Sequence, residues 1–118
     1  MIVNILGTEY EIVFKDYNKC EEFKRRSIDG YCDCVNRELY VCNMRTYPDL
    51  KNEKESYCKK IEKRILRHEI IHAFLNESGL ADSSFCYNES WATNEEMVDW
   101  IANQGIKLYK AWEQANAI

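Results

Sequence analysis

The two histidines of the chain, His68 and His72, lie four residues apart in the stretch RHEIIHAFLNESG at positions 67–79. Glu69 follows the first of them, so the pattern is H-E-x-x-H. On a helix, residues four apart project from the same face, and two imidazoles can then reach one metal ion. Glu69 would lie beside that ion and could accept a proton from a metal-bound water. The pattern predicts a zinc site with Glu69 as its catalytic base.

A catalytic zinc ion takes three protein ligands and keeps one position for water, so this site needs a third ligand. The extended motif H-E-x-x-H-x-x-G-x-x-H does not continue here, because Leu75 occupies its glycine position and Ser78 its last histidine position. The chain has no further histidine. The third ligand must therefore be a carboxylate or a cysteine.

Two glutamates in the stretch TNEEMVDW, residues 93–100, are the candidates for this third ligand. Glu95 has Asp99 four residues further on, where the two side chains share a helix face. Glu96 has a different explanation, because Thr93 and Glu96 match the Thr-x-x-Glu capping box of a helix start. We therefore expect Glu95 to be the ligand and keep Glu96 as the alternative.

The motif Asn94-Glu95-x-x-x-Asp99 downstream of H-E-x-x-H resembles the N-E-x-x-x-D motif of the gluzincins, the thermolysin-like metallopeptidases. Residues 64–102 also resemble small phage and prophage zincins and the minigluzincins. The resemblance implies that Glu95 is the third zinc ligand and that Asp99 accepts a hydrogen bond from a zinc-binding histidine, here His68. It further implies one zinc ion per chain, a peptide or protein substrate, and hydrolysis of peptide bonds.

Two further features of these metallopeptidases need a counterpart in this chain: a group that stabilises the oxyanion and a strand that binds the peptide. Full-length gluzincins stabilise the oxyanion with a third histidine, which is missing here, and the hydroxyl groups of Tyr87 and Tyr109 are the substitutes we consider. In zincins, an edge strand above the active-site helix receives an extended peptide by strand addition. We expect the segment from Glu38 to Asn43 to be that edge.

Two other functions remain open for the same motif. In the first, the ligands close a structural or regulatory zinc site in a non-catalytic phage protein. In the second, the protein is a phage-derived interaction module whose motif is vestigial. Glu69 separates catalysis from the first alternative, because a structural site does not need a carboxylate at that position.

The first half of the sequence predicts two β-hairpins with a short helical turn near Glu21 to Lys24 between them. One hairpin turns at Gly7-Thr8 and the other at Asn36-Arg37. Alternation along the strands predicts the residues that share the inner face. In the first hairpin these are Val3, Ile5, Tyr10, Ile12 and Phe14, and in the second they are Cys32, Cys34, Leu39 and Val41.

The second half predicts two helices. The first runs from Lys54 to Asn76, with Gly79 as a left-handed cap and a loop over residues 80–92. The second follows Thr93, and Gly105 is expected to bend or divide it. Its predicted buried side consists of Met97, Val98, Ile101, Ala102, Leu108 and Trp112. The result is a single α+β domain over residues 1–118, a minimal zincin-like fold in which a small, mostly antiparallel sheet packs on the H-E-x-x-H helix.

Composition limits the remaining possibilities. Apolar residues make up 46% and charged residues 31% of the 118 residues, which is typical of a folded globular protein. A net charge of −4 gives no reason to expect a nucleic-acid partner. No targeting segment or membrane span is visible, so we expect a cytoplasmic protein of a bacterial cell, encoded by a phage or prophage as the resemblance implies. The oligomeric state is left open.

In that compartment the six cysteines should be thiols. Their spacing contains no C-x-x-C pair, and Cys32 and Cys34 share one face of a predicted strand, where they can serve as small apolar residues. A second metal site built from cysteines is a less favoured alternative.

Overall fold

A computed structural model describes residues 1–83 and 91–118 of the chain. Its four strands are β1 (Ile2–Ile5), β2 (Thr8–Asp16), β3 (Gly30–Asp33) and β4 (Glu38–Asn43). They form one sheet in the order β1-β2-β4-β3. The two outer pairs are antiparallel hairpins and the central pair, β2 with β4, is parallel. The sheet is therefore mixed, and β1 and β3 are its edges.

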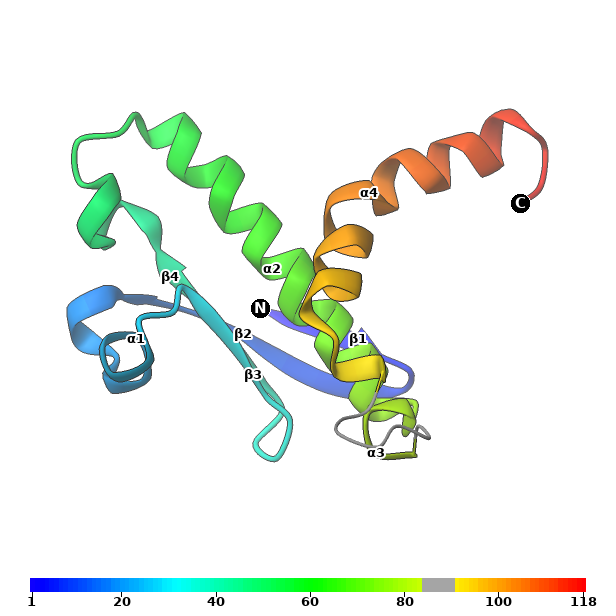
Figure 1. The fold of residues 1–118 in the computed structure, drawn as a ribbon, viewed down its shortest axis with the longest axis horizontal. Coiled ribbons are helices and arrows are strands. Elements are labelled where there is room, and N and C mark those ends of the chain that lie inside the picture. The colour runs from blue at the N-terminus through cyan, green and yellow to red at the C-terminus, as the bar shows by residue number, and fades with distance from the viewer. Residues whose placement is uncertain (84–90) are drawn as a thin grey trace.

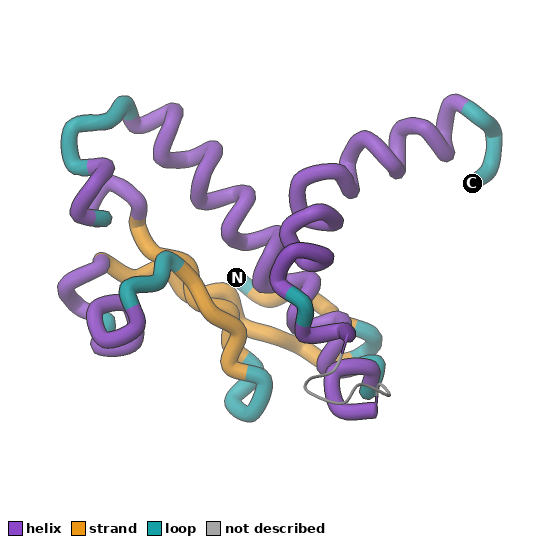
Figure 2. The backbone as a smooth tube through the Cα atoms, viewed as in Figure 1, coloured by secondary structure: helices purple, strands orange, loops and turns teal. Residues whose placement is uncertain are grey.

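Four α-helices accompany the sheet in the described residues. They are α1 (Glu21–Arg26), α2 (Glu55–Glu77), α3 (Leu80–Ser83) and α4 (Glu95–Gln114), and the short 3-10 turns are η1 (Tyr17–Lys19), η2 (Met44–Thr46), η3 (Pro48–Leu50) and η4 (Trp91–Thr93). Helix α2 lies across one face of the sheet, and α4 crosses α2 before extending away from the strands (Figures 1 and 2). The predicted α+β class is confirmed. In the described ranges, no helix has both the length and the apolar character needed to span a bilayer.

The first hairpin turns one residue earlier than predicted. Ile5 pairs with Thr8, so the turn residues are Leu6 and Gly7, with φ angles of 50° and 90°. Two consecutive positive φ angles are the signature of a type I′ turn, whose twist suits a two-residue hairpin. The residues predicted for the inner face of this hairpin are still buried or half-buried after this shift. Phe14 is the exception, at 49% exposed.

The second hairpin corrects the prediction for the peptide-binding edge. In this hairpin, Cys32 of β3 lies opposite Leu39 of β4, so these two residues share a face as predicted. A loop of residues 34–37 connects the strands. However, β4 pairs with β2 on its other side, so the segment from Glu38 to Asn43 is internal to the sheet. The prediction of an edge there is wrong. The free edge of this hairpin is β3.

Helix α2 follows the predicted range within one residue, and Gly79, two residues after its end at Glu77, has the expected left-handed conformation with a φ of 80°. Its fully covered positions recur at steps of four, three, four and four, which is the pattern of a single helix face. They are Cys58, Glu62, Ile65, Glu69 and Ala73. Two of the five are glutamates, so α2 directs two carboxylates toward the interior.

Helix α4 begins differently from the prediction. The Asn94 side chain caps it, because its Oδ1 accepts a hydrogen bond of 2.8 Å from the Met97 backbone N–H. The predicted capping box of Thr93 and Glu96 is therefore wrong. The helix is not divided at Gly105, although its axis bends along its length in Figure 1.

The predicted buried side of α4 is correct only in its first half. Val98 and Ala102 are buried, whereas Ile101, Leu108 and Trp112 are 36%, 38% and 46% exposed. The C-terminal half of the helix extends beyond the sheet and α2, as Figure 1 shows, and its large apolar side chains are exposed. The periodicity of the sequence predicted which face of α4 is apolar, but not where α4 passes beyond the sheet and α2.

Two contacts hold α2 against the sheet near its C-terminal end. The Glu77 carboxylate accepts hydrogen bonds from Tyr10 Oη at 2.7 Å and from Thr8 Oγ1 at 3.0 Å. These bonds hold the pKa of Glu77 below its usual value, because both stabilise the ionised form. They fix the end of α2 that follows the two histidines.

Gly30, the first residue of β3, lets the edge strand approach α2 closely. A Cβ atom at this position would lie 2.5 Å from Ile65 Cγ2, 2.9 Å from the Tyr40 carbonyl oxygen and 3.2 Å from Glu69 Oε1. One of these neighbours is backbone and cannot move aside easily. Only glycine therefore allows β3 to lie this close to Glu69.

We expect the Gly30→Ala substitution to lower the free energy of unfolding by about 1–3 kcal/mol, the usual cost of overpacking a filled interior. Urea denaturation measures this change. Gly105→Ala is the matched control, because a Cβ there meets nothing within 4 Å and alanine favours the helix. Equal stability of Gly30→Ala and wild type would contradict the close approach.

Candidate metal centre

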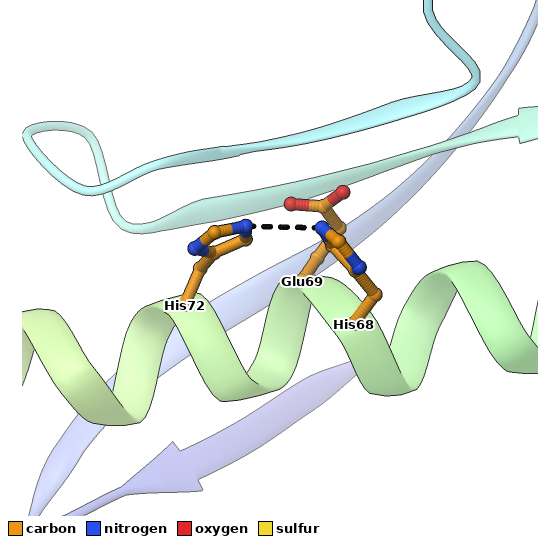
Figure 3. Close-up of side chains that lie close together, drawn as sticks. All are labelled: His68, Glu69 and His72. Atoms are coloured by element: carbon orange, nitrogen blue, oxygen red, sulfur yellow. Dashed lines mark hydrogen bonds between the residues drawn. The ribbon is translucent and has the colours of Figure 1, made fainter. Parts of the chain in front are cut away.

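The two histidines converge on one point beside α2. His68 and His72 project from the same side of the helix, and their Nε2 atoms are 3.0 Å apart (Figure 3). Burial lowers the pKa of His72, because desolvation disfavours the imidazolium. A neutral imidazole keeps a lone pair for a metal ion. The predicted pairing of the two rings across one helical turn is present.

Glu95, the first residue of α4, reaches both of these nitrogens. Its Oε2 lies 3.0 Å from His68 Nε2, and its Oε1 lies 3.2 Å from His72 Nε2. Glu96 is exposed one position later, where the helix has rotated by about 100° away from the histidines. The structure thus brings together His68, His72 and Glu95, and it does so across two helices.

The spacing of the three donor groups fits a zinc ion. With Zn–N and Zn–O bonds of about 2.0–2.1 Å, the ligand atoms of a tetrahedral site lie about 3.3 Å apart. The two Nε2 atoms are 3.0 Å apart, and each lies 3.0 or 3.2 Å from a different oxygen of the Glu95 carboxylate. Two imidazoles with one carboxylate also form a ligand set known for catalytic zinc, which leaves a fourth position open.

Asp99 fixes the state of the first histidine. Its Oδ1 lies 2.7 Å from His68 Nδ1. A carboxylate oxygen accepts the hydrogen bond, so this contact favours the His68 tautomer with the hydrogen on Nδ1 and the lone pair on Nε2. Asp99 therefore directs the lone pair of His68 toward Glu95 and His72. This is the contact that the resemblance implied.

Glu69 lies deeper than the other members of the group. It is 5% exposed, and its side chain points from α2 toward the neighbouring strands (Figure 3). Donor atoms of His68, Glu69 and His72 all lie within 4.8 Å of one another. Burial, together with the carboxylates of Glu95 and Asp29, raises the pKa of Glu69 to about 8. A cation bound by the neighbouring donors would oppose that shift.

The group opens into a cavity of about 790 Å³ between α2, β3 and the start of α4. Sequence reasoning missed several residues of its wall. Arg64 could have been predicted to line the cavity, because it lies four residues before His68 on the same helix face. Arg26 and Asp29 could not, since they lie far away in the sequence, at the end of α1 and just before β3.

The two tyrosines considered for oxyanion stabilisation have different outcomes. Tyr109 lines a separate apolar groove with Ile70 and Ile106, outside the cavity of the histidines, so that prediction is wrong. The reason is the divergence of the two helices, which carries the later turns of α4 away from the site. Tyr87 lies outside the described residues.

Comparisons of the chain with protein family models, with curated proteins and with solved structures found no match. A function for this chain therefore has to be inferred from its own side chains and their geometry.

We expect Glu95→Ala to weaken zinc binding by more than about 100-fold, beyond the 10- to 100-fold loss that is typical when only a partner of a ligand is removed. Competition with a chromophoric chelator measures the affinity. Glu96→Ala is the matched control and should bind zinc as wild type does, because this glutamate is turned away from the histidines. The reverse ranking of the two variants would make Glu96 the ligand.

We expect Asp99→Ala to lower zinc affinity by about 10- to 100-fold, since His68 would lose the carboxylate that fixes its tautomer. Asn103→Ala, one turn later on α4 and in the wall of the same cavity, should leave the affinity unchanged. If both variants weaken binding equally, the effect comes from general damage to α4 rather than from the hydrogen bond to His68.

Proposed function

We propose that the protein is a zinc metallopeptidase of the gluzincin type that hydrolyses peptide bonds. The observation that carries this proposal is the convergence of His68, His72 and Glu95 beside a buried Glu69. The resemblance of residues 64–102 to small phage and prophage zincins suggests a phage or prophage gene and a bacterial host cell. The substrate class is a peptide or an unfolded segment of a protein.

His68, His72 and Glu95 are the residues that would hold the zinc ion, with Asp99 orienting His68. When bound, zinc polarises the carbonyl group of a substrate and lowers the pKa of a coordinated water to about 7. The donor atoms need little rearrangement to do this, because they already lie at about the distances of a tetrahedral site. Preorganised ligands cost little free energy at the moment of binding.

Glu69 would act as the general base and then as the general acid. Its carboxylate would accept a proton from the attacking water and transfer it to the nitrogen of the leaving amine. Two properties of this side chain support the role. It lies within reach of the histidine donors, and its burial raises its proton affinity above that of an exposed glutamate.

Strand β3 is the element on which a substrate would be held. It is a free edge of the sheet, and its residues Gly30 and Cys32 line the cavity together with the histidines. An extended peptide can add to such an edge through main-chain hydrogen bonds. The glycine also keeps the strand close to α2, so a peptide on β3 would pass near Glu69.

The non-catalytic zinc protein is the competing proposal. It accounts for His68, His72 and Glu95, but it gives no role to a carboxylate buried at position 69. Burying a carboxylate among other acidic groups costs free energy, and such groups concentrate at catalytic sites. We therefore favour the enzyme over the structural site.

We expect Glu69→Gln to reduce peptide hydrolysis by about 10²- to 10⁴-fold, the usual contribution of a general base, with zinc content and thermal stability retained. Glu62→Gln is the matched control, because Glu62 is the other buried glutamate of α2 and is also directed inward. Initial rates on a library of quenched fluorescent peptides measure the effect. Undiminished hydrolysis by Glu69→Gln would exclude this residue as the base, and no hydrolysis by zinc-loaded wild type on any peptide would favour the structural site.

A further inference from the structure

Cys32 and Cys34 form a close pair of thiols in the wall of the same cavity. Their Sγ atoms are 3.3 Å apart. Both side chains are partly exposed and both line the cavity, whereas Cys20, Cys42 and Cys58 are buried. Cys86 lies outside the described residues. Among the described cysteines, these two thus combine proximity to each other with access from solvent.

The hairpin explains why the two sulfurs meet. Cys32 is in β3 opposite Leu39, and Cys34 is the first residue of the loop that leads into β4. Side chains two apart on an extended chain point to the same face. Closing a bond of about 2.05 Å between the sulfurs requires an approach of about 1.2 Å. Rotation of the two side chains and a change in the loop would have to provide that movement.

The two thiols also differ in acidity. The two sulfurs share a hydrogen bond in which either can be the donor. With Cys32 as the donor, this bond lowers the pKa of Cys34 to about 7. The same bond, together with burial, raises the pKa of Cys32. A thiolate next to a thiol that retains its proton is the arrangement of a nucleophile with a resolving partner.

We propose that Cys32 and Cys34 are a thiol–disulfide exchange site that reacts with low-molecular-weight disulfides such as oxidised glutathione. The Cys34 thiolate attacks one sulfur of the small disulfide, forms a mixed disulfide and releases one thiolate. Cys32 then loses its proton and attacks the Cys34 sulfur, which forms the Cys32–Cys34 disulfide and releases the second thiol. Two protein thiols are oxidised, and one disulfide is reduced to two thiols.

This site does not depend on the proposed peptidase. The side chains proposed to hold the metal are His68, His72 and Glu95, and neither sulfur belongs to the close group of donor atoms from His68, Glu69 and His72. However, the Cys32–Cys34 pair lies in the cavity wall. Oxidation of the two thiols would therefore alter the surface that a peptide bound on β3 contacts. The exchange chemistry can therefore be measured without any hydrolysis assay.

The test is the reaction of the folded full-length chain with oxidised glutathione at neutral pH, followed by trapping of remaining thiols and mass spectrometry of peptides. We expect wild type to lose about 2 Da through a Cys32–Cys34 bond. Cys32→Ser should instead keep one glutathione on Cys34, because the resolving thiol is missing. Cys34→Ser should react at least about tenfold more slowly than wild type, since the activated sulfur is gone.

Cys58→Ser serves as the matched control, because this thiol is buried, and it should react as wild type does. The proposal is overturned if wild type reacts no faster than Cys34→Ser, or if the bond maps to other cysteines. Each of these outcomes is independent of whether the protein cleaves peptides.

Discussion

The crossing of α2 and α4 is the constraint on which the candidate metal site depends. Val98 and Ala102 are the buried residues of α4, and α4 packs on α2. Arg67 Nε donates a hydrogen bond of 2.8 Å to the Ala102 carbonyl oxygen, which fixes the two helices directly beside His68. Helical geometry then places Glu95 and Asp99 next to the packed stripe, facing the histidines. Without the crossing, the two histidines would have no carboxylate partners from α4.

The two buried glutamates of α2 show how differently the same side chain can be used. The Glu62 carboxylate accepts a hydrogen bond of 3.0 Å from the Met44 backbone N–H and pairs with Lys59 Nζ at 2.8 Å. Its burial is compensated by these partners, as expected of a structural carboxylate. Glu69 faces the carboxylates of Glu95 and Asp29 instead, and its pKa is raised. Repulsion of this kind lowers stability, so a role in chemistry is the better account of Glu69.

The sequence predicted the local parts of this arrangement well. The H-E-x-x-H spacing was sufficient to place His68 and His72 on one helix face, and Asp99 at four residues' distance correctly favoured Glu95 over Glu96 as the carboxylate that reaches them. One supporting argument was wrong, because Asn94 and not Thr93 caps α4. The preference held because the helix phase, rather than the cap, decides which glutamate faces the histidines.

What the sequence could not predict depends on contacts between distant segments. The parallel pairing of β2 with β4 has no local signal, and it moved the free edge from β4 to β3. Arg26 and Asp29 reach the cavity through the same non-local folding. The apolar pattern of α4 likewise predicted a buried Trp112, although the helix leaves the protein body before that residue.

The most direct test of the account is the zinc K-edge X-ray absorption spectrum of the wild-type chain, purified without chelator or added metal. The account predicts about one zinc ion per chain with a nitrogen and oxygen shell at about 2.0–2.1 Å and the outer-shell features of two imidazoles. A sulfur shell at about 2.3 Å would place zinc on the cysteines and contradict the proposed ligands. Failure of the chain to take up zinc at all would contradict the metal site itself.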